Sequence, residues 1–320
     1  MRNHSIDTLK CICAIFVIAI HTIQPQEISN FTTPLLRCAV PIFFIISGYF
    51  TFGKKDIGQT IRKRLIYMLK IFGWASLFNL LFFIIINGKE SINHLYSILS
   101  IDSLLFNIVP YGRQLWYIVA YIYVLLLMLF IEKFNLYKLL YWSTPILLIA
   151  SLLLGKYSEI ALDYKTTAFL TRNFLFTGLP FFTIGMLIKQ VHTYIHTYIH
   201  TYIHTYTIAI LCTIFYILGI IEYCIPGLSN GDLYITNIFL SPALFILFLN
   251  ITQTKDNILS KIGREDSLYI YILHFHISMI YADYKNIIPY SAYFGTAIVF
   301  SVTMFLIYIL RKLKIIGRII

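Results

Sequence analysis

Residues 7–25 read DTLKCICAIFVIAIHTIQP, and most of this stretch is apolar. A helix needs roughly 20 predominantly apolar residues to cross the hydrocarbon core of a bilayer. The stretch follows Arg2 and lacks the small-residue cleavage site that ends a secretory signal peptide. We therefore expect it to be a retained first transmembrane helix.

Similar stretches recur along the whole chain. Of the 320 residues, 59% are hydrophobic and only 12% are charged, whereas soluble domains carry about 25% charged residues. We expect about ten membrane spans of the required length. They are placed at 7–25, 35–53, 66–87, 114–131, 138–155, 172–189, 206–222, 233–251, 267–283 and 291–310. The sequence thus predicts an all-α, polytopic transmembrane helix bundle, and because no change in composition divides it, one integral membrane domain over residues 1–320.

Lysine and arginine are distributed unevenly between the two sides of this bundle. The formal net charge is +11, and the cytoplasmic loops of membrane proteins are enriched in basic residues. With a cytoplasmic N-terminus, the outer loops hold only Lys89, Arg113, Lys156, Lys165, Arg172 and Lys285. We therefore expect both termini in the cytoplasm. Because the basic residues are explained by membrane orientation, we expect no nucleic-acid partner.

Residues 192–205 read HTYIHTYIHTYIHT, an uninterrupted four-residue period. On a helix the histidines would have the i, i+4 spacing that suits a metal, but each step drifts by about 40° and no acidic or cysteine ligand joins them. We therefore expect no metal site. A repeated CATA nucleotide unit would encode this peptide cycle in every reading frame, and slippage in such a tract would switch the protein on and off. The repeat thus predicts phase variation of a surface structure.

The first predicted helix carries Asp7, Lys10 and His21. Lys10 and His21 are eleven residues apart, which projects them within about 20° of each other on an ideal helix. Asp7 lies about 40° to the other side of His21. Ionisable residues inside a span are costly and usually mark function. We therefore expect a polar stripe along this helix that faces the interior of the bundle.

The second predicted helix opens with Arg37 and continues as PIFFIISGYF over residues 41–50. Ser47 and Gly48 are small, and small residues let another helix approach closely in membranes. Arg37 enters from the outer side, near the expected depth of His21. A histidine that takes a proton and an arginine that balances an anion would together make a reaction centre.

These residues resemble the acyltransferase 3 family, multi-helix bacterial membrane proteins that O-acylate cell-surface glycans. The similar segments are Asp7–Lys10 with His21, Arg37 with residues 41–50, Leu115-Trp116-Tyr117, residues 172–182 (RNFLFTGLPFF) with Gly185, and residues 267–274 (SLYIYILH). They extend over most of the chain, in the order of the family. One position departs from it, because Lys10 stands where the family usually has arginine, and lysine lacks the planar fork that binds phosphate in a bidentate manner.

The resemblance implies transfer of an acyl group from cytoplasmic acyl-CoA, most often acetyl-CoA, to a hydroxyl of an extracytoplasmic or lipid-linked sugar at the bacterial inner membrane. His21 would be the base or a transient acyl carrier. Arg37 would stabilise negative charge, and Lys10 would hold the CoA phosphates. No bound cofactor is implied. Further substrate-binding or supporting residues would be Asp7, Ser47, Trp116, Arg172 and His274.

Other roles remain open for each of these residues. Lys10 could pair with Asp7 at i, i−3 spacing and reach the lipid headgroups, and His21 could serve in a helix–helix hydrogen bond. Arg37 and Trp116 could be interfacial anchors. Two further acidic residues, Glu222 and Asp232, lie at span ends, and we expect them to be solvated. The main alternative function is export or flipping of a polysaccharide or glycolipid without transferase chemistry.

Overall fold

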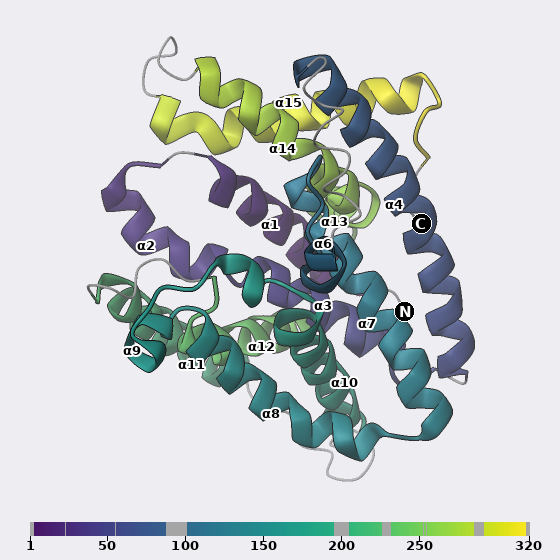
Figure 1. Ribbon diagram of the computed structural model, residues 1–320, viewed down its shortest axis with the longest axis vertical. Coiled ribbons are helices and arrows are strands. Elements are labelled where there is room, and N and C mark those ends of the chain that lie inside the picture. The colour runs from purple at the N-terminus through teal and green to yellow at the C-terminus, as the bar shows by residue number, and fades with distance from the viewer. Residues whose placement is uncertain are drawn as a thin grey trace. The chain divides into compact units, whose positions relative to one another are not determined.

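The computed structural model describes residues 3–22, 24–54, 56–87, 101–194, 205–225, 232–251, 253, 255–284 and 291–317. Every regular element within these ranges is a helix (Figure 1), which confirms the all-α class. A bilayer favours this outcome, because a helix satisfies its backbone hydrogen bonds within one segment. Most of the histidine repeat, residues 195–204, lies outside the described residues, so the interpretations of that tract stay predictions.

Each of the ten predicted spans corresponds to a helical region. Within the described ranges, eight helical segments are long and apolar enough to cross a membrane: His4–His21, Gln26–Thr51, Ile57–Ile86, Arg113–Phe134, Tyr137–Leu154, Phe174–Tyr194, Thr205–Cys224 and Ala292–Lys312. The other two predicted spans coincide with α12 (Ile235–Asn250), which has 16 residues, and α14 (Ser267–Tyr284). Two histidines, four tyrosines and one aspartate make α14 less apolar than the rest.

The chain packs into two compact units, each built from separate segments of sequence. The first unit comprises Met1–Phe43, Ile203–Ser229 and Tyr234–Ile320, and the second comprises Phe44–Tyr202 and Asn230–Leu233. The division falls within α3 (Ala39–Thr51). Because neither unit is a continuous stretch of chain, the expectation of one functional domain over 1–320 stays a prediction.

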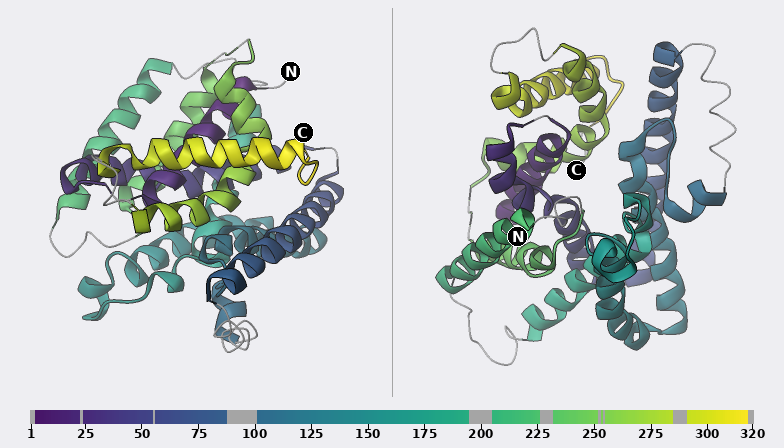
Figure 2. Two further views of the ribbon diagram at one scale, coloured as in Figure 1. Left: turned by 90° about the horizontal axis from the view of Figure 1, so that it is seen from above. Right: turned by 60° about the vertical axis from the view of Figure 1, so that its left-hand side comes forward.

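Helix α1 (His4–His21) is the central element of the first unit. It packs against α2 (Gln26–Leu36), α12, α13 (Ile258–Glu265), α14 and α15 (Ser291–Lys312) (Figure 1). The approach to α13 is closest at Gly263, where an added Cβ would overlap the carbonyl oxygen of Asp7. Figure 2 shows α14 and α15 side by side, and Gly295 of α15 lies against the ring of Tyr281. The unit is completed by α11 (Thr205–Cys224), which packs against α2 and α12.

The helical segment Gln26–Thr51, which contains most of the predicted second span 35–53, is interrupted by a turn at Arg37. Helix α2 ends at Leu36, and α3 begins at Ala39. Arg37 lies in the turn between them, and its N–H donates to the carbonyl of Thr33. The break has a local cause, because Pro41 in the first turn of α3 has no N–H to donate to the carbonyl of Arg37. The prediction that Arg37 opens a helix is therefore wrong.

In the second unit, α7 (Trp116–Phe134) packs against α4 (Ile57–Asn87) and α8 (Tyr137–Leu154). The remaining elements of this unit are α6 (Ile101–Phe106), η3 (Arg113–Leu115), α9 (Ser158–Leu162), η4 (Ala168–Leu170), η5 (Phe174–Gly178) and α10 (Leu179–Tyr194). The element η5 is a short π-helix that leads into α10. Pro180 explains its wider turn, because it cannot donate a hydrogen bond to the carbonyl of Phe176.

Helices α3 and α10 cross closely at two glycines. An added Cβ at Gly48 would overlap the carbonyl oxygen of Phe182, and one at Gly185 would overlap the carbonyl oxygen of Ile45. The expectation that Gly48 lets another helix approach is confirmed. Such contacts stabilise a membrane protein through van der Waals packing, since lipid provides no hydrophobic driving force between helices.

Replacement of either crossing glycine should destabilise the second unit. We expect Gly48→Ala and Gly185→Ala each to cost roughly 1–3 kcal/mol or more, because the obstacle is backbone that cannot rotate away. The measurement is the thermal unfolding midpoint of the detergent-solubilised protein. Gly73→Ala in α4 is the matched control, because nothing lies within 4 Å of its added Cβ. Equal midpoints for all three variants would contradict the close crossing.

Candidate active site

His21 is the last residue of α1, and its side chain is exposed at the end of that helix. Its ring lies next to two residues of α14. The centroid of the His21 ring is 5.3 Å from that of His274 and 5.6 Å from that of Phe275, which meets it edge-on. The structure therefore brings together His21 and His274, two predicted site residues that are more than 250 positions apart in the sequence.

His274 differs from His21 in being fully buried. Its Nδ1 lies 3.0 Å from the carbonyl oxygen of Ile270, one turn earlier in α14. A carbonyl oxygen only accepts, so in the neutral ring Nδ1 carries the proton and Nε2 carries the lone pair. The buried Nε2 has no hydrogen-bond partner in the part of the chain that the structure describes. A lone pair inside the unit thus lies close to the ring of His21.

Arg37 belongs to the same compact unit and is half-buried in the turn between α2 and α3. Its expected cooperation with His21 stays a prediction. The surroundings of the turn are polar, because Asn237 Nδ2 donates to the carbonyl of Pro34 at 2.9 Å and contacts Cys38 Sγ at 3.0 Å. Asn237 of α12 therefore contacts the chain on both sides of Arg37, at the backbone of Pro34 and at the side chain of Cys38.

Lys10 and Asp7 form an ion pair near the start of α1. Their Nζ and Oδ1 atoms are 2.9 Å apart, and the side chains are 26% and 4% exposed respectively. This contact agrees with the expectation that Lys10 pairs with Asp7. A phosphate that binds Lys10 must therefore compete with a buried carboxylate.

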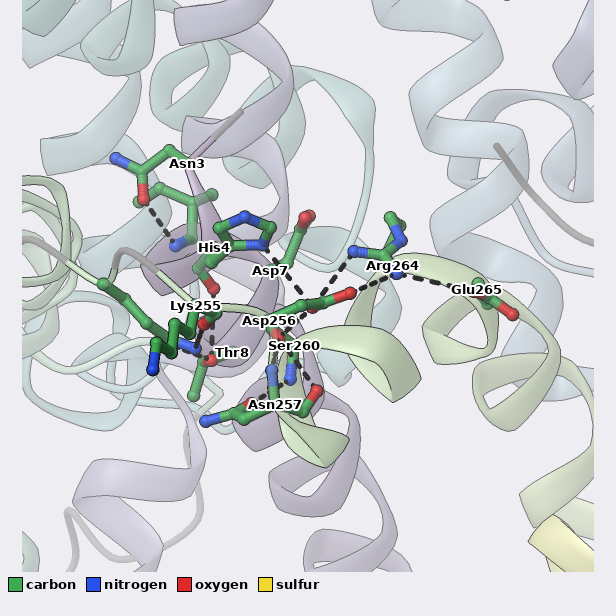
Figure 3. Close-up of polar contacts among 12 residues, drawn as sticks. Asn3, His4, Asp7, Thr8, Lys255, Asp256, Asn257, Ser260, Arg264 and Glu265 are labelled. Carbon is green, nitrogen blue, oxygen red and sulfur yellow. Dashed lines mark hydrogen bonds and ion pairs between the residues drawn. The ribbon is translucent and has the colours of Figure 1, made fainter. Parts of the chain in front are cut away.

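Near Asp7, a polar cluster that was not predicted from the sequence connects α13 to the start of α1 (Figure 3). Arg264 donates to both carboxylate oxygens of Asp256, with the shorter contact at 2.7 Å. His4 Nδ1 lies 3.4 Å from the same carboxylate. Hydrogen bonds from Arg264 and Ser260 hold the pKa of Asp256 well below its usual range. The sequence signal for this cluster is the capping box of Asn257 and Ser260 at the start of α13.

The end of α15 reaches the same region. Arg311 donates to the carbonyl of Glu265 at 3.0 Å and pairs with Asp266 at 2.5 Å. The N-terminal end of α1, the connection from α12 to α14 and the C-terminal end of α15 therefore lie together. The expectation that both termini share one side of the membrane agrees with this arrangement.

Trp116 and Arg172 lie together in the second unit, and Asp232 joins them. Arg172 binds the two carboxylate oxygens of Asp232, each at 2.7 Å. The guanidinium lies 5.9 Å from the centroid of the Trp116 ring, a distance typical of a cation–π contact. The expectation that Asp232 is simply solvated is wrong. In the same unit, Ser47 accepts a hydrogen bond from Arg64 through its carbonyl at 2.8 Å, so its backbone stabilises the end of α3.

Glu222 was also expected to be solvated, and that expectation is wrong as well. It is buried in the first unit, where its carboxylate accepts from the backbone N–H groups of Ile235 and Thr236 at 2.9 and 3.1 Å. These are unpaired donors at the start of α12, so Glu222 acts as the cap of a neighbouring helix. Its role is structural.

No cluster of three or more histidine, cysteine, aspartate or glutamate residues that could hold a metal is present among the described residues. The unit that contains His21 provides the neighbouring imidazoles of His21 and His274, the half-buried Arg37 and the paired Lys10. Imidazole near neutrality serves as a general base or as a nucleophile. The arrangement can therefore take a proton from a hydroxyl.

Comparison with known proteins finds one family model that matches nearly the whole chain. A family model for an acyltransferase domain matches residues 3–312. A serine/alanine racemase of Enterococcus gallinarum is 26% identical over 298 residues, which cover 86% of this chain and 40% of that protein. An amino-acid racemase of Enterococcus faecalis is 24% identical over 319 residues, which cover 90% of this chain and 43% of that protein. The chain thus spans about two fifths of the length of these curated relatives. No solved structure matches.

Proposed function

Because the chain belongs to the acyltransferase family whose model covers residues 3–312, we propose that it is a membrane-embedded O-acyltransferase of surface glycans. The donor is cytoplasmic acyl-CoA, with acetyl-CoA the first choice, and the acceptor is a hydroxyl of a cell-surface polysaccharide or lipid-linked glycan. The observation that carries the proposal is the proximity of His21 and His274 in a membrane protein of this family. The protein is placed in the bacterial inner membrane, where both substrates can reach it.

His21 acts as the general base in this reaction. It takes the proton of the acceptor hydroxyl while the hydroxyl oxygen attacks the thioester carbonyl carbon. The new C–O bond forms, the C–S bond breaks, and the proton passes from His21 to the thiolate of CoA. The step needs no oxidant, metal or bound cofactor. Arg37 balances the negative charge that develops on the carbonyl oxygen, since a fixed positive charge is most effective where water is excluded.

Lys10 binds the phosphates of the acyl-CoA. It lies on the same helix as His21, about 16 Å away along the axis, which leaves room for the pantetheine arm between phosphate and thioester. Asp7 holds the ammonium group when no donor is bound. The exchange of a carboxylate for a phosphate keeps Lys10 neutralised in both states.

In the second unit, Trp116 and Arg172 are assigned to the acceptor. An aromatic ring offers a flat apolar surface to a sugar, and the Arg172–Asp232 pair offers both a donor and an acceptor for hydroxyl groups. Ser47 has a supporting role, because its carbonyl accepts the hydrogen bond from Arg64 that stabilises the end of α3.

Acyl transfer and the competing function, export of a glycan intermediate, differ in what they predict for the mass of surface glycans. We expect surface glycans from cells with the wild-type protein to carry an acyl-sized mass increment, and His21→Ala to abolish it. Mass spectrometry of the glycans measures this, with both proteins at matched membrane levels. His192→Ala, in α10, is the control histidine variant and should keep the increment. Unchanged glycan masses with an altered amount of surface polymer would favour the exporter.

Competition between Asp7 and phosphate for Lys10 predicts opposite effects of two substitutions. Asp7→Asn should lower the KM for acetyl-CoA by about two- to fivefold, the range expected when a competing ion pair is removed. Lys10→Gln should raise the KM by a similar factor, while kcat changes little in both variants. Steady-state kinetics in membranes measures this effect. If Lys10→Gln leaves the KM unchanged, the phosphates bind elsewhere.

A further inference from the structure

His274 has one nitrogen with an assigned role and one without. Its Nδ1 donates to the carbonyl oxygen of Ile270 at 3.0 Å, which fixes the neutral tautomer. Its Nε2 then carries a lone pair and is buried without a hydrogen-bond partner among the described residues. An unsatisfied buried acceptor costs about 1–3 kcal/mol. A donor at this position would recover that cost.

The ring of His21 is placed to be this donor. The two ring centroids are 5.3 Å apart, and the ring planes are inclined by 41°. An N–H···N hydrogen bond of about 3 Å, with each nitrogen roughly 1 Å from its own ring centre, requires centroids about 5 Å apart. The edge of Phe275 lies against the His21 ring at 5.6 Å and limits its rotation.

We propose that His274 is the positioning residue for His21: its Nε2 accepts a hydrogen bond from a ring N–H of His21 in the resting protein and throughout the reaction. This inference rests on the proposed function, in which His21 is the base. The bond assigns the proton of neutral His21 to the nitrogen that faces His274. The other nitrogen of His21 then carries the lone pair that takes the proton of the acceptor hydroxyl.

A neutral imidazole is a suitable partner in this environment. In soluble hydrolases a carboxylate often holds the catalytic histidine in the correct tautomer. A buried carboxylate would be costly at this position in a membrane protein, whereas an imidazole locked by its own helix backbone has no charge to desolvate. When His21 takes the proton of the acceptor, its N–H becomes a stronger donor, and the bond to His274 stabilises the charged ring.

Kinetics of three variants separate positioning from packing. His274→Phe keeps a ring but removes the hydrogen-bond acceptor. The kcat should fall on the order of 10- to 100-fold, less than the loss expected when the base itself is removed. The KM for acetyl-CoA should not change. His274→Gln can donate to the Ile270 carbonyl and still accept from His21, so it should recover most of the kcat. His276→Gln is the neighbouring control and should resemble the wild type. Full activity in His274→Phe, or equal losses in His274→Phe and His274→Gln, would overturn the inference.

A second measurement does not depend on turnover. Magnetic resonance of the purified protein with isotope-labelled histidine reports which ring nitrogens carry protons and whether two rings share an N–H···N bond. We expect His274 to be protonated at Nδ1 and coupled through Nε2 to His21, with the coupling lost in His274→Gln. A proton on Nε2 of His274, or no coupling between the rings, would overturn the inference. Absence of acyl transfer by the wild type, together with an intact coupling, would instead refute the proposed function alone.

Discussion

The hydrocarbon core of a bilayer contains no water, so each polar group placed there needs a partner within the protein. In the first unit, this requirement explains contacts that a soluble protein would leave to solvent. Glu222 satisfies two backbone donors at the start of α12, and Asn237 satisfies the carbonyl of Pro34. Asp7 neutralises Lys10. The contacts of Glu222 and Asn237 tie together separate segments whose apolar surfaces alone would not fix their register.

The same requirement makes an unsatisfied polar atom informative. Nε2 of His274 is buried without a partner in the described part of the chain, although the other nitrogen of the same ring is satisfied. His21 lies beside it at the end of α1, where its side chain is exposed. A base needs one side that is held and one side that is accessible. His274 would hold one side of the His21 ring, and the other side is accessible. Phe275 adds an apolar contact to the same ring.

Apolar run length was sufficient to predict the helices, because a bilayer leaves few other conformations for such a stretch. The close crossing at Gly48 was predictable for a similar reason, since a small residue in an apolar helix marks an approach of backbone to backbone. The break at Arg37 was missed, although its cause is local: Pro41 removes the hydrogen bond that a continuous helix would make to the carbonyl of Arg37. Pro41, four residues after the arginine, is the sequence signal for this break.

The partners of charged residues could not be predicted from the sequence. Asp232 is 60 positions from Arg172, and Arg264 binds the carboxylate of Asp256, which lies just before the start of α13. Such pairs depend on how the chain packs, which no periodicity encodes. Among the site residues, His21 and His274 were both identified and are found together. Trp116 and Arg172 were identified as well, but the carboxylate of Asp232 as the partner of Arg172 was not.

The most direct test is a count of products in sealed inverted membrane vesicles supplied with radiolabelled acetyl-CoA. Acyl transfer at His21 predicts that one free CoA thiol appears for each acetyl group esterified to glycan, and that His21→Ala abolishes both products together. Transport of a glycan across the vesicle membrane while acetyl-CoA stays intact would contradict it.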